Sequence, residues 1–293
     1  MTMQLMPKLR AVKRFWGSSA QQPHLNQLLA GLLPTMTRGH RFGTDWVSEA
    51  SRTKAASSPT GCVPLNPLEA FADSHTDGRG MWKWTHYLDI YHRHFQKFIG
   101  KDVHVAEVGV YSGGSLEMYK SYFGAKCHVY GVDIREECRS LQNETTKIFI
   151  GDQADRGFWR RFRQEVPVLD MLIDDGGHKT EQQIVTLEEI LPHLRPGGVF
   201  ICEDVVGEYN GFGAYVAGLV SKLDTCELIR GPAKELSSTP VPFQADIDSI
   251  HNYSYVTVIE KRATPIRQFE SFTRGTDWAW IPLWERKAAP SKL

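Results

Sequence analysis

The chain has 293 residues, which suits one large domain with an appendage or two small domains. Hydrophobic residues make up 41% of it, so a full core is possible. The 34 basic and 34 acidic residues give a formal net charge of zero, which argues against nucleic acid or an anionic membrane as the main partner. No run of about 18 apolar residues occurs, so the sequence predicts no transmembrane helix.

Residues 1–75 are predicted to form an irregular N-terminal extension that serves oligomerisation or covers a substrate. A short helix is expected over 24–33 and a linker over 51–67. No acidic residue precedes Asp45, although several basic ones do, so organelle targeting is the alternative. The five cysteines are scattered without a CxxC pair, which favours reduced thiols in a cytoplasmic protein. We expect a homo-oligomer, either a dimer or a tetramer.

The periodicity of the remaining chain predicts alternating helices and strands. An amphipathic helix is expected over 81–98. Strands are expected over 103–109, 128–134, 147–150, 168–174, 199–202, 226–230 and 253–260. Helices are expected from about Ser115 and over 156–164, 178–194 and 211–223. This alternation predicts a doubly wound, Rossmann-like α/β domain, which we bound at residues 76–262. The tail 263–293 is rich in tryptophan and is expected to pack on that domain or to act as a lid.

A glycine-rich turn follows the first predicted strand, over Glu107–Ser115. The dinucleotide fingerprint GxGxxG is not met, because Tyr111 stands where its second glycine belongs, so a cofactor without a pyrophosphate fits better. Asp133 ends the second strand, 24 residues after Gly109, where an acid can accept hydrogen bonds from both ribose hydroxyls. Residues 151–153 (Gly-Asp-Gln) follow the third strand and could reach an adenine edge. The sequence therefore predicts a nucleoside-type cofactor.

Four carboxylates end the next two predicted strands, Asp174 and Asp175 on one and Glu203 and Asp204 on the other. Like charges gathered at neighbouring strand ends repel unless a cation or a proton intervenes. Oxygen ligands without cysteine or paired histidine suit Mg²⁺ before Zn²⁺. Adjacent residues of a regular strand point to opposite faces, so Glu203 and Asp204 share an ion only if the strand breaks there. The alternative is a surface ion pair, with Asp175 capping the helix near residue 178.

Five motifs together resemble class I S-adenosylmethionine-dependent methyltransferases, and more narrowly the macrocin/mycinamicin sugar O-methyltransferase and cephalosporin-hydroxylase-like group. The motifs are ExGxxxGGS (107–115), the strand-end Asp133, GDQ (151–153), IDDGGH (173–178) and LRPGGVFICED (194–204). The resemblance spans residues 73–261. It implies a seven-stranded sheet whose last strand runs antiparallel, and a segment 73–87 that helps close over the cofactor.

The resemblance also implies a division of the site residues. The residues expected to hold the cofactor are Glu107, Gly109, Tyr111, Ser115, Asp133, Asp152, Gln153 and Asp174. The residues expected to bind Mg²⁺ are Asp175, Glu203 and Asp204, with Asp174 facing the cofactor or orienting its neighbour.

Removing a proton from a hydroxyl requires a base within reach. His251 follows Asp248 by three residues, a spacing that resembles an acid/base pair of the macrolide-sugar enzymes. We therefore expect His251 to be the general base and Asp248 its orienting partner. The alternative is a solvated loop histidine. His178 has the same spacing from Asp175 and is expected to cap or support the metal loop.

The predicted function is metal-dependent transfer of a methyl group from S-adenosylmethionine to a hydroxyl of a small molecule, such as a natural product or a sugar. The alternatives are N- or C-methylation and a catalytically degenerate scaffold. A nicotinamide oxidoreductase is disfavoured by the missing GxGxxG.

Overall fold

A computed structural model describes residues 32–46, 66–208, 210–225, 228–230, 236–272 and 274. The chain divides into two compact units, residues 1–63 and 64–293. The described part of the first unit is centred on helix α3 (Leu33–Thr44). The predictions for 24–33 and 51–67 fall almost wholly outside the described residues, and of the tail 263–293 the structure describes residues 263–272 and 274.

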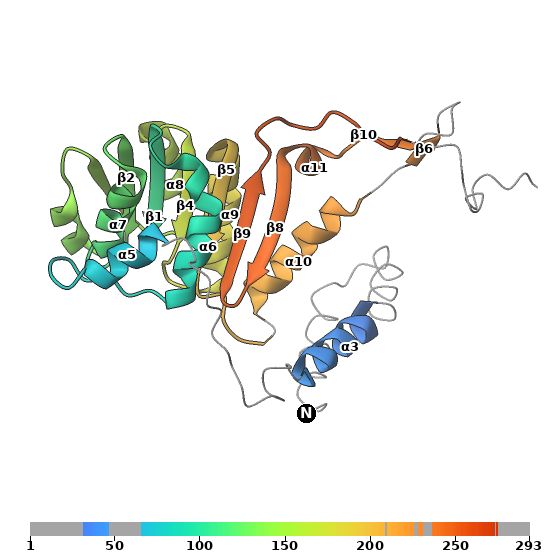
Figure 1. Cartoon of the computed structure of the whole chain (residues 1–293), viewed down its shortest axis with the longest axis horizontal. Helices are drawn as coiled ribbons and strands as arrows, with labels where there is room; N and C mark the ends of the chain where they lie inside the picture. The colour runs from blue at the N-terminus through green and yellow to red at the C-terminus, as the bar shows by residue number, and fades with distance from the viewer. Residues whose placement is uncertain are drawn as a thin grey trace, which may run out of the picture. The chain divides into compact units, whose positions relative to one another are not determined.

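A seven-stranded sheet forms the centre of the second unit, in the order β3-β2-β1-β4-β5-β9-β8 (Figure 1). The first five strands run parallel, and β9 is antiparallel to both of its neighbours. The bounds are β1 (Val103–Val108), β2 (Cys127–Asp133), β3 (Thr146–Ile150), β4 (Leu169–Asp174), β5 (Leu194–Cys202), β8 (Ile247–Tyr253) and β9 (Val256–Lys261). The predicted fold class, with an antiparallel last strand, is confirmed.

Helices cover both faces of this sheet. On β1, Val103 and Val105 join one buried cluster, whereas Ala106 and Val108 join the other, because alternate side chains of a strand point to opposite faces. The helices on the first face are α5 (Pro67–Ser74), α6 (Thr85–Phe95) and α7 (Gly114–Phe123). Those on the second are α8 (Arg156–Glu165), α9 (Thr180–Ile190) and α10 (Gly211–Leu223). Helix α5, assigned to the extension from the sequence, thus lies with the second unit.

The remaining elements are short. They are the 3-10 helices η2 (Gln96–Phe98), η3 (Glu136–Leu141) and η4 (Leu191–His193), the helix α11 (Pro242–Asp246), and a small sheet of β6 (Leu228–Arg230), β7 (Leu236–Ser238) and β10 (Phe269–Glu270). In the part of the chain that the structure describes, no helix is both long enough and apolar enough to cross a membrane.

Side-chain caps fix where three of the helices begin. Asn66, Asp155 and Asn210 each accept hydrogen bonds from backbone N–H groups of the first turn of α5, α8 and α10. Such caps satisfy donors that have no partner within the helix. The helix starts are therefore encoded locally.

Several elements differ from the sequence prediction: the strand expected over 226–230 is β6 of the small sheet, and two further differences concern α6 and β8. The helix expected over 81–98 begins only at Thr85, and Trp84 before it is extended with ψ 134°. The strand β8 was not expected, because its polar residues disrupt the apolar alternation that a strand prediction relies on. Within the described ranges it pairs with β9 alone, at the edge of the sheet, where polar side chains are tolerated. Both differences matter for the site.

A partly buried ion pair joins α6 and η2 to β9. Glu260 Oε1 lies 3.2 Å from His94 Nδ1 and accepts a hydrogen bond from Lys97 Nζ at 3.0 Å. The hydrogen bond from His94 and the charge of Lys97 outweigh the effect of burial and lower the pKa of Glu260 to about 2. The folded state therefore favours the ionised carboxylate.

We predict that Glu260→Gln destabilises the protein at pH 6 by about 2 kcal/mol, after discounting for the partial exposure of Lys97. Because the folded pKa lies below the unfolded one, this stabilisation is present above pH 4.5 and is lost as the pH falls towards 2. Urea unfolding of both proteins at pH 3 and pH 6 measures it. Glu136→Gln, at an exposed pair with Arg139, is the control. A loss that does not depend on pH would contradict the assignment.

Candidate functional site

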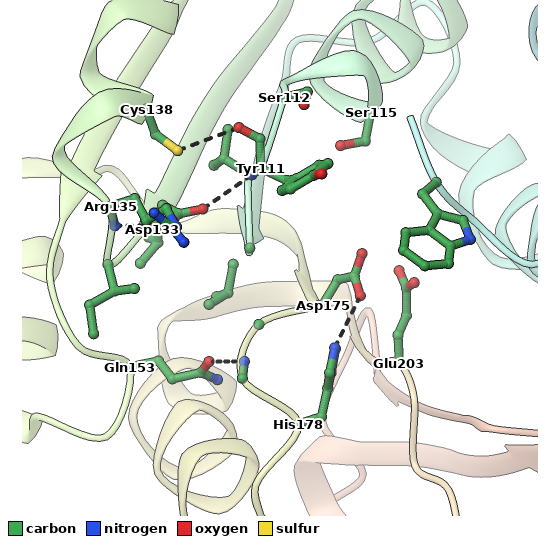
Figure 2. A pocket seen from close by; sticks show the side chains of 18 of the residues that line it. Tyr111, Ser112, Ser115, Asp133, Arg135, Cys138, Gln153, Asp175, His178 and Glu203 are labelled. Atoms are coloured by element: carbon green, nitrogen blue, oxygen red, sulfur yellow. Dashed lines mark hydrogen bonds and ion pairs between the residues drawn. The ribbon is translucent and has the colours of Figure 1, made fainter. Parts of the chain in front are cut away.

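A cavity of about 990 Å³ opens where the carboxyl ends of the parallel strands meet. Its walls are the turn after β1, the ends of β2 and β3, the turn after β4, the end of β5, and the segment before α6. In Figure 2, Asp133 and Gln153 lie on one side of this cavity, and Asp175, His178 and Glu203 lie on the other. The edge of a parallel sheet thus gathers polar groups from elements far apart in sequence.

The turn after β1 brings backbone close to backbone. Gly109 has φ +87°, and a Cβ there would lie 2.0 Å from the carbonyl oxygen of Asp175. Tyr111, which has φ +49°, donates its backbone N–H to Asp133 Oδ2 at 3.1 Å (Figure 2). These approaches tie the turn to both sides of the cavity.

We predict that Gly109→Ala costs about 3 kcal/mol or more, since it combines a left-handed φ with a clash against rigid backbone. Gly100→Ala is a matched control: Gly100 also has a positive φ, +75°, but a Cβ there meets nothing within 4 Å. It should cost only about 1 kcal/mol. Thermal unfolding of both variants separates the clash from the backbone strain, and equal losses would contradict the close approach.

Six of the predicted cofactor residues line the cavity: Gly109, Tyr111, Ser115, Asp133, Asp152 and Gln153. Asp133 Oδ1 accepts from the N–H of Arg135 at 2.9 Å, which aims the carboxylate while leaving lone pairs free. Gln153 is buried and held at both ends, since its Oε1 accepts from Gly177 N and its Nε2 donates to Asp174. Its orientation is therefore fixed.

The other two predicted cofactor residues lie behind the cavity wall. Glu107 is fully buried and accepts hydrogen bonds from Ser115 Oγ at 2.5 Å and Tyr119 OH at 3.0 Å. Asp174 is 1% exposed, and burial raises its pKa to about 7. Neither residue lines the cavity, so the structure does not favour direct contact of either one with a cofactor. They lie beneath the cavity wall, where Glu107 holds Ser115 and Asp174 holds Gln153, two residues that do line the cavity.

The three predicted metal ligands, Asp175, Glu203 and Asp204, all line the cavity. Strand β5 ends at Cys202, and Asp204 takes a left-handed φ of +51°. The strand thus breaks where it must for adjacent side chains to face one region. Asp175 does not cap α9, whose N-cap is Lys179.

Lys83 inserts an ammonium group among these carboxylates from the extended segment before α6. Its Nζ donates to Asp175 Oδ2 at 2.5 Å, to both oxygens of Glu203 at 3.0 and 3.1 Å, and to Glu107 Oε1 at 3.3 Å. Tyr91 also donates to Glu203. Burial opposes the charge of Lys83, but the surrounding carboxylates outweigh it and raise its pKa well above the usual value. Lys83 is therefore a structural cation.

A second group of contacts holds Asp204. Its Oδ1 accepts from Tyr87 OH at 2.7 Å and from Trp84 Nε1 at 3.2 Å, while Oδ2 lies 3.6 Å from His178 Nε2. His178 Nε2 also lies 4.0 Å from Asp175 Oδ1. One ligand atom each from Asp175, His178 and Asp204 falls within 4.8 Å of the others. This spacing and donor set fit a divalent cation.

We predict that Lys83→Met destabilises the protein by about 3–5 kcal/mol at pH 8, because it leaves Glu107 and Glu203 buried without their cation. Burial raises the pKa of both carboxyl groups, so the loss should shrink at pH 5, where they can fold protonated. Lys97→Met, which removes a partly exposed lysine, should cost about 1 kcal/mol or less. Urea unfolding in chelator-treated buffer measures both losses, and equal ones would contradict the role of Lys83.

The predicted catalytic pair does not reach this cavity. His251 and Asp248 lie on β8, and neither lines the cavity. Asp248 is bound by Arg262, and His251 Nε2 lies 2.9 Å from Ser249 Oγ with its ring 4.9 Å from that of His94. Their catalytic role stays a prediction that no contact in the described residues supports. The resemblance in spacing did not reveal that the pair sits on an edge strand.

Three residues of the site, Lys83, Trp84 and Tyr87, were not selected from the sequence, and His178 was given only a supporting role at the metal loop. The first two were assigned to a helix that begins after them. His178 has the same D-x-x-H spacing as His251, but it follows a strand end that already carried two acids. Its place three residues after the acidic end of a predicted strand was the sequence signal that could have marked it as a site residue.

Comparisons with known proteins agree with this geometry. No family model matches the chain. Demethylmacrocin O-methyltransferase of Streptomyces fradiae is 27% identical over 80% of this chain and 61% of its own length. Mycinamicin VI 2''-O-methyltransferase of Micromonospora griseorubida is 27% identical over 75% of this chain and 59% of its own length. The chain is similar to these O-methyltransferases, and the predicted resemblance is confirmed.

A solved structure supports the same relationship. MycE methyltransferase from the mycinamycin biosynthetic pathway, in complex with Mg and SAH, is 27% identical to this chain with a TM-score of 0.55, over 69% of this chain and 55% of that one. The same enzyme with Mg, SAH and mycinamycin VI matches 77% of this chain and 61% of that one. The chain shares their fold. It spans only about 60% of the length of the first curated relatives it matches.

Proposed function

We propose that this protein transfers a methyl group from S-adenosylmethionine to a hydroxyl of a small molecule with the help of a divalent cation, and that the acceptor is a sugar of a natural product. The observation that carries the proposal is the meeting of Asp175, His178 and Asp204 in the same cavity as the glycine turn and Asp133. One cavity then offers a nucleoside site and, beside it, a cation and acceptor site. Curated relatives named for O-methylation of a rhamnosyl tetracenomycin and of an olivosyl oleandolide support the choice of acceptor.

The donor side of the cavity suits a nucleoside with a short charged tail. Asp133 would accept from the ribose hydroxyls, while Asp152 and Gln153 border the adenine end. The turn at Gly109, where backbone replaces side chain, would lie against the methionine part. The absence of a second fingerprint glycine at Tyr111 disfavours a pyrophosphate cofactor.

The acceptor side suits Mg²⁺, which Asp175 and Asp204 would hold with His178 beside them. A bound cation would lower the pKa of a coordinated hydroxyl and fix its position. Glu203, already engaged by Lys83, adds negative charge to the same place. The net charge of the cluster favours a divalent cation there.

His178 is the residue placed to accept the acceptor's proton. It lines the cavity, is partly exposed, and has its Nε2 facing Asp175 and Asp204. A base in this position would share the hydroxyl that the cation binds. With the proton removed, positioning the oxygen in line with the methyl group is the remaining task of the protein. The cytoplasmic location and the homo-oligomer stay predictions from the sequence.

The test is calorimetric titration of S-adenosylhomocysteine and of Mg²⁺ into the wild type and three variants. Asp133→Ala should weaken S-adenosylhomocysteine about tenfold or more while leaving Mg²⁺ binding intact. Asp175→Asn should weaken Mg²⁺ to a similar extent and spare the nucleoside. His178→Ala should retain the nucleoside, weaken Mg²⁺ less than Asp175→Asn does, and lose methyl transfer to a glycoside acceptor. No nucleoside binding by the wild type would refute the function, and unchanged Mg²⁺ binding by Asp175→Asn would refute the cation site.

A further inference from the structure

Three aromatic rings form a cluster beside Asp204, which we term the aromatic patch (Trp84, His86 and Tyr255). The ring centroids of Trp84 and Tyr255 lie 5.6 Å apart, and His86 lies 6.3 and 6.1 Å from these two. His86 Nε2 also lies 3.0 Å from the carbonyl oxygen of Ser254, which connects α6 to the turn between β8 and β9. The patch is therefore a packed unit built from two distant parts of the chain.

Trp84 carries the exposed surface of this patch. It is 54% exposed and lines the cavity, so a large apolar face is presented to a ligand rather than to the core. Its indole N–H donates to Asp204 Oδ1, which fixes the ring relative to a residue of the cation and acceptor site. A rigid, exposed aromatic face beside a polar cluster is typical of a binding surface.

Backbone strain supports the same conclusion. Tyr255 has φ +66°, a conformation that glycine adopts at lower cost. Within the described ranges, four non-glycine residues have a positive φ, and the other three, Tyr111, His178 and Asp204, line the cavity. Strained residues persist where the surrounding structure requires them, and they cluster at functional sites. Tyr255 does not line the cavity, but its ring backs Trp84.

We propose that the aromatic patch is the subsite for the acceptor's sugar ring, with Trp84 stacking on one face of a pyranose. This inference rests on the proposed function and adds to it the surface that would favour a cyclic sugar over an acyclic polyol as the acceptor. The C–H groups on one face of a pyranose carry partial positive charge and complement the negative face of an aromatic ring. With the ring on Trp84, a hydroxyl at its edge lies towards Asp204 and His178. A ring bearing several hydroxyls satisfies both surfaces at once, whereas an acyclic polyol offers no face to stack.

The decisive comparison is between Trp84→Phe and Trp84→Leu. Both variants lose the hydrogen bond to Asp204, and only the first keeps an aromatic face. The probes are methyl α-L-rhamnopyranoside and the acyclic polyol L-rhamnitol, titrated in the presence of S-adenosylhomocysteine and Mg²⁺ and followed by saturation-transfer NMR. We expect the glycoside to bind the Phe variant about fivefold more tightly than the Leu variant. L-Rhamnitol should bind the two variants equally.

Tyr255→Gly provides a second test that does not endanger the fold, because glycine suits the φ of this position. It should change thermal stability little, since relief of the backbone strain offsets the lost ring contacts with Trp84 and His86, and weaken the glycoside about twofold to threefold. Equal glycoside binding by the Phe and Leu variants, or no glycoside binding by the wild type, would overturn the subsite. So would a shift of oligomeric state in Trp84→Leu by sedimentation, since the patch would then be a subunit interface. Failure of the proposed function would be distinguishable, because S-adenosylhomocysteine would not bind the wild type at all.

Discussion

The site depends on the need to neutralise carboxylates that three parallel strands bring to one edge of the sheet. Glu107, Asp175 and Glu203 come from the ends of β1, β4 and β5, and like charges this close raise one another's energy. Lys83 supplies the compensating ammonium. Residues 81–84, which carry that lysine to the strand ends, precede the helix rather than form part of it, and they also line the cavity. The segment that brings Lys83 to neutralise the carboxylates therefore also forms part of the cavity wall.

The backbone meets a related constraint. Gly109 and Gly114 leave room for neighbouring backbone that a Cβ would displace, the latter lying beneath the carbonyls of Arg79 and Gly80. Asp204 and His178 reach the cavity through left-handed φ values, which non-glycine residues adopt at a cost. The compact sheet and its two buried clusters hold these conformations in place. The free energy of packing the core thus offsets the strain of these conformations and holds the polar groups in fixed positions.

Sequence patterns predicted the parallel strands and the positions of Asp133, Asp175, Glu203 and Asp204, because strand-end residues are placed by topology alone. They did not predict which of the acidic residues at the strand ends line the cavity. Glu107 and Asp174 are equally polar but are fully buried within β1 and β4 and do not line the cavity. Nor did they predict the start of α6, since the apolar spacing that marks its buried face continues upstream through Trp84 and Met81. Helix initiation depends on tertiary contacts there, and no side-chain cap marks it.

The contacts of Lys83, Trp84 and Tyr87 divide the oxygens of the acidic residues in a consistent way. Asp175 gives one oxygen to Lys83, and Asp204 gives one to Trp84 and Tyr87, so that the remaining oxygen of each faces His178. Neither carboxylate must reorient to bind a cation or a hydroxyl, so the entropy of ordering them is already lost on folding. Glu203 differs, since both of its oxygens accept from Lys83. Glu203 therefore contributes mainly negative charge to the cluster, and Asp175 and Asp204 are better placed to offer a free oxygen to a cation.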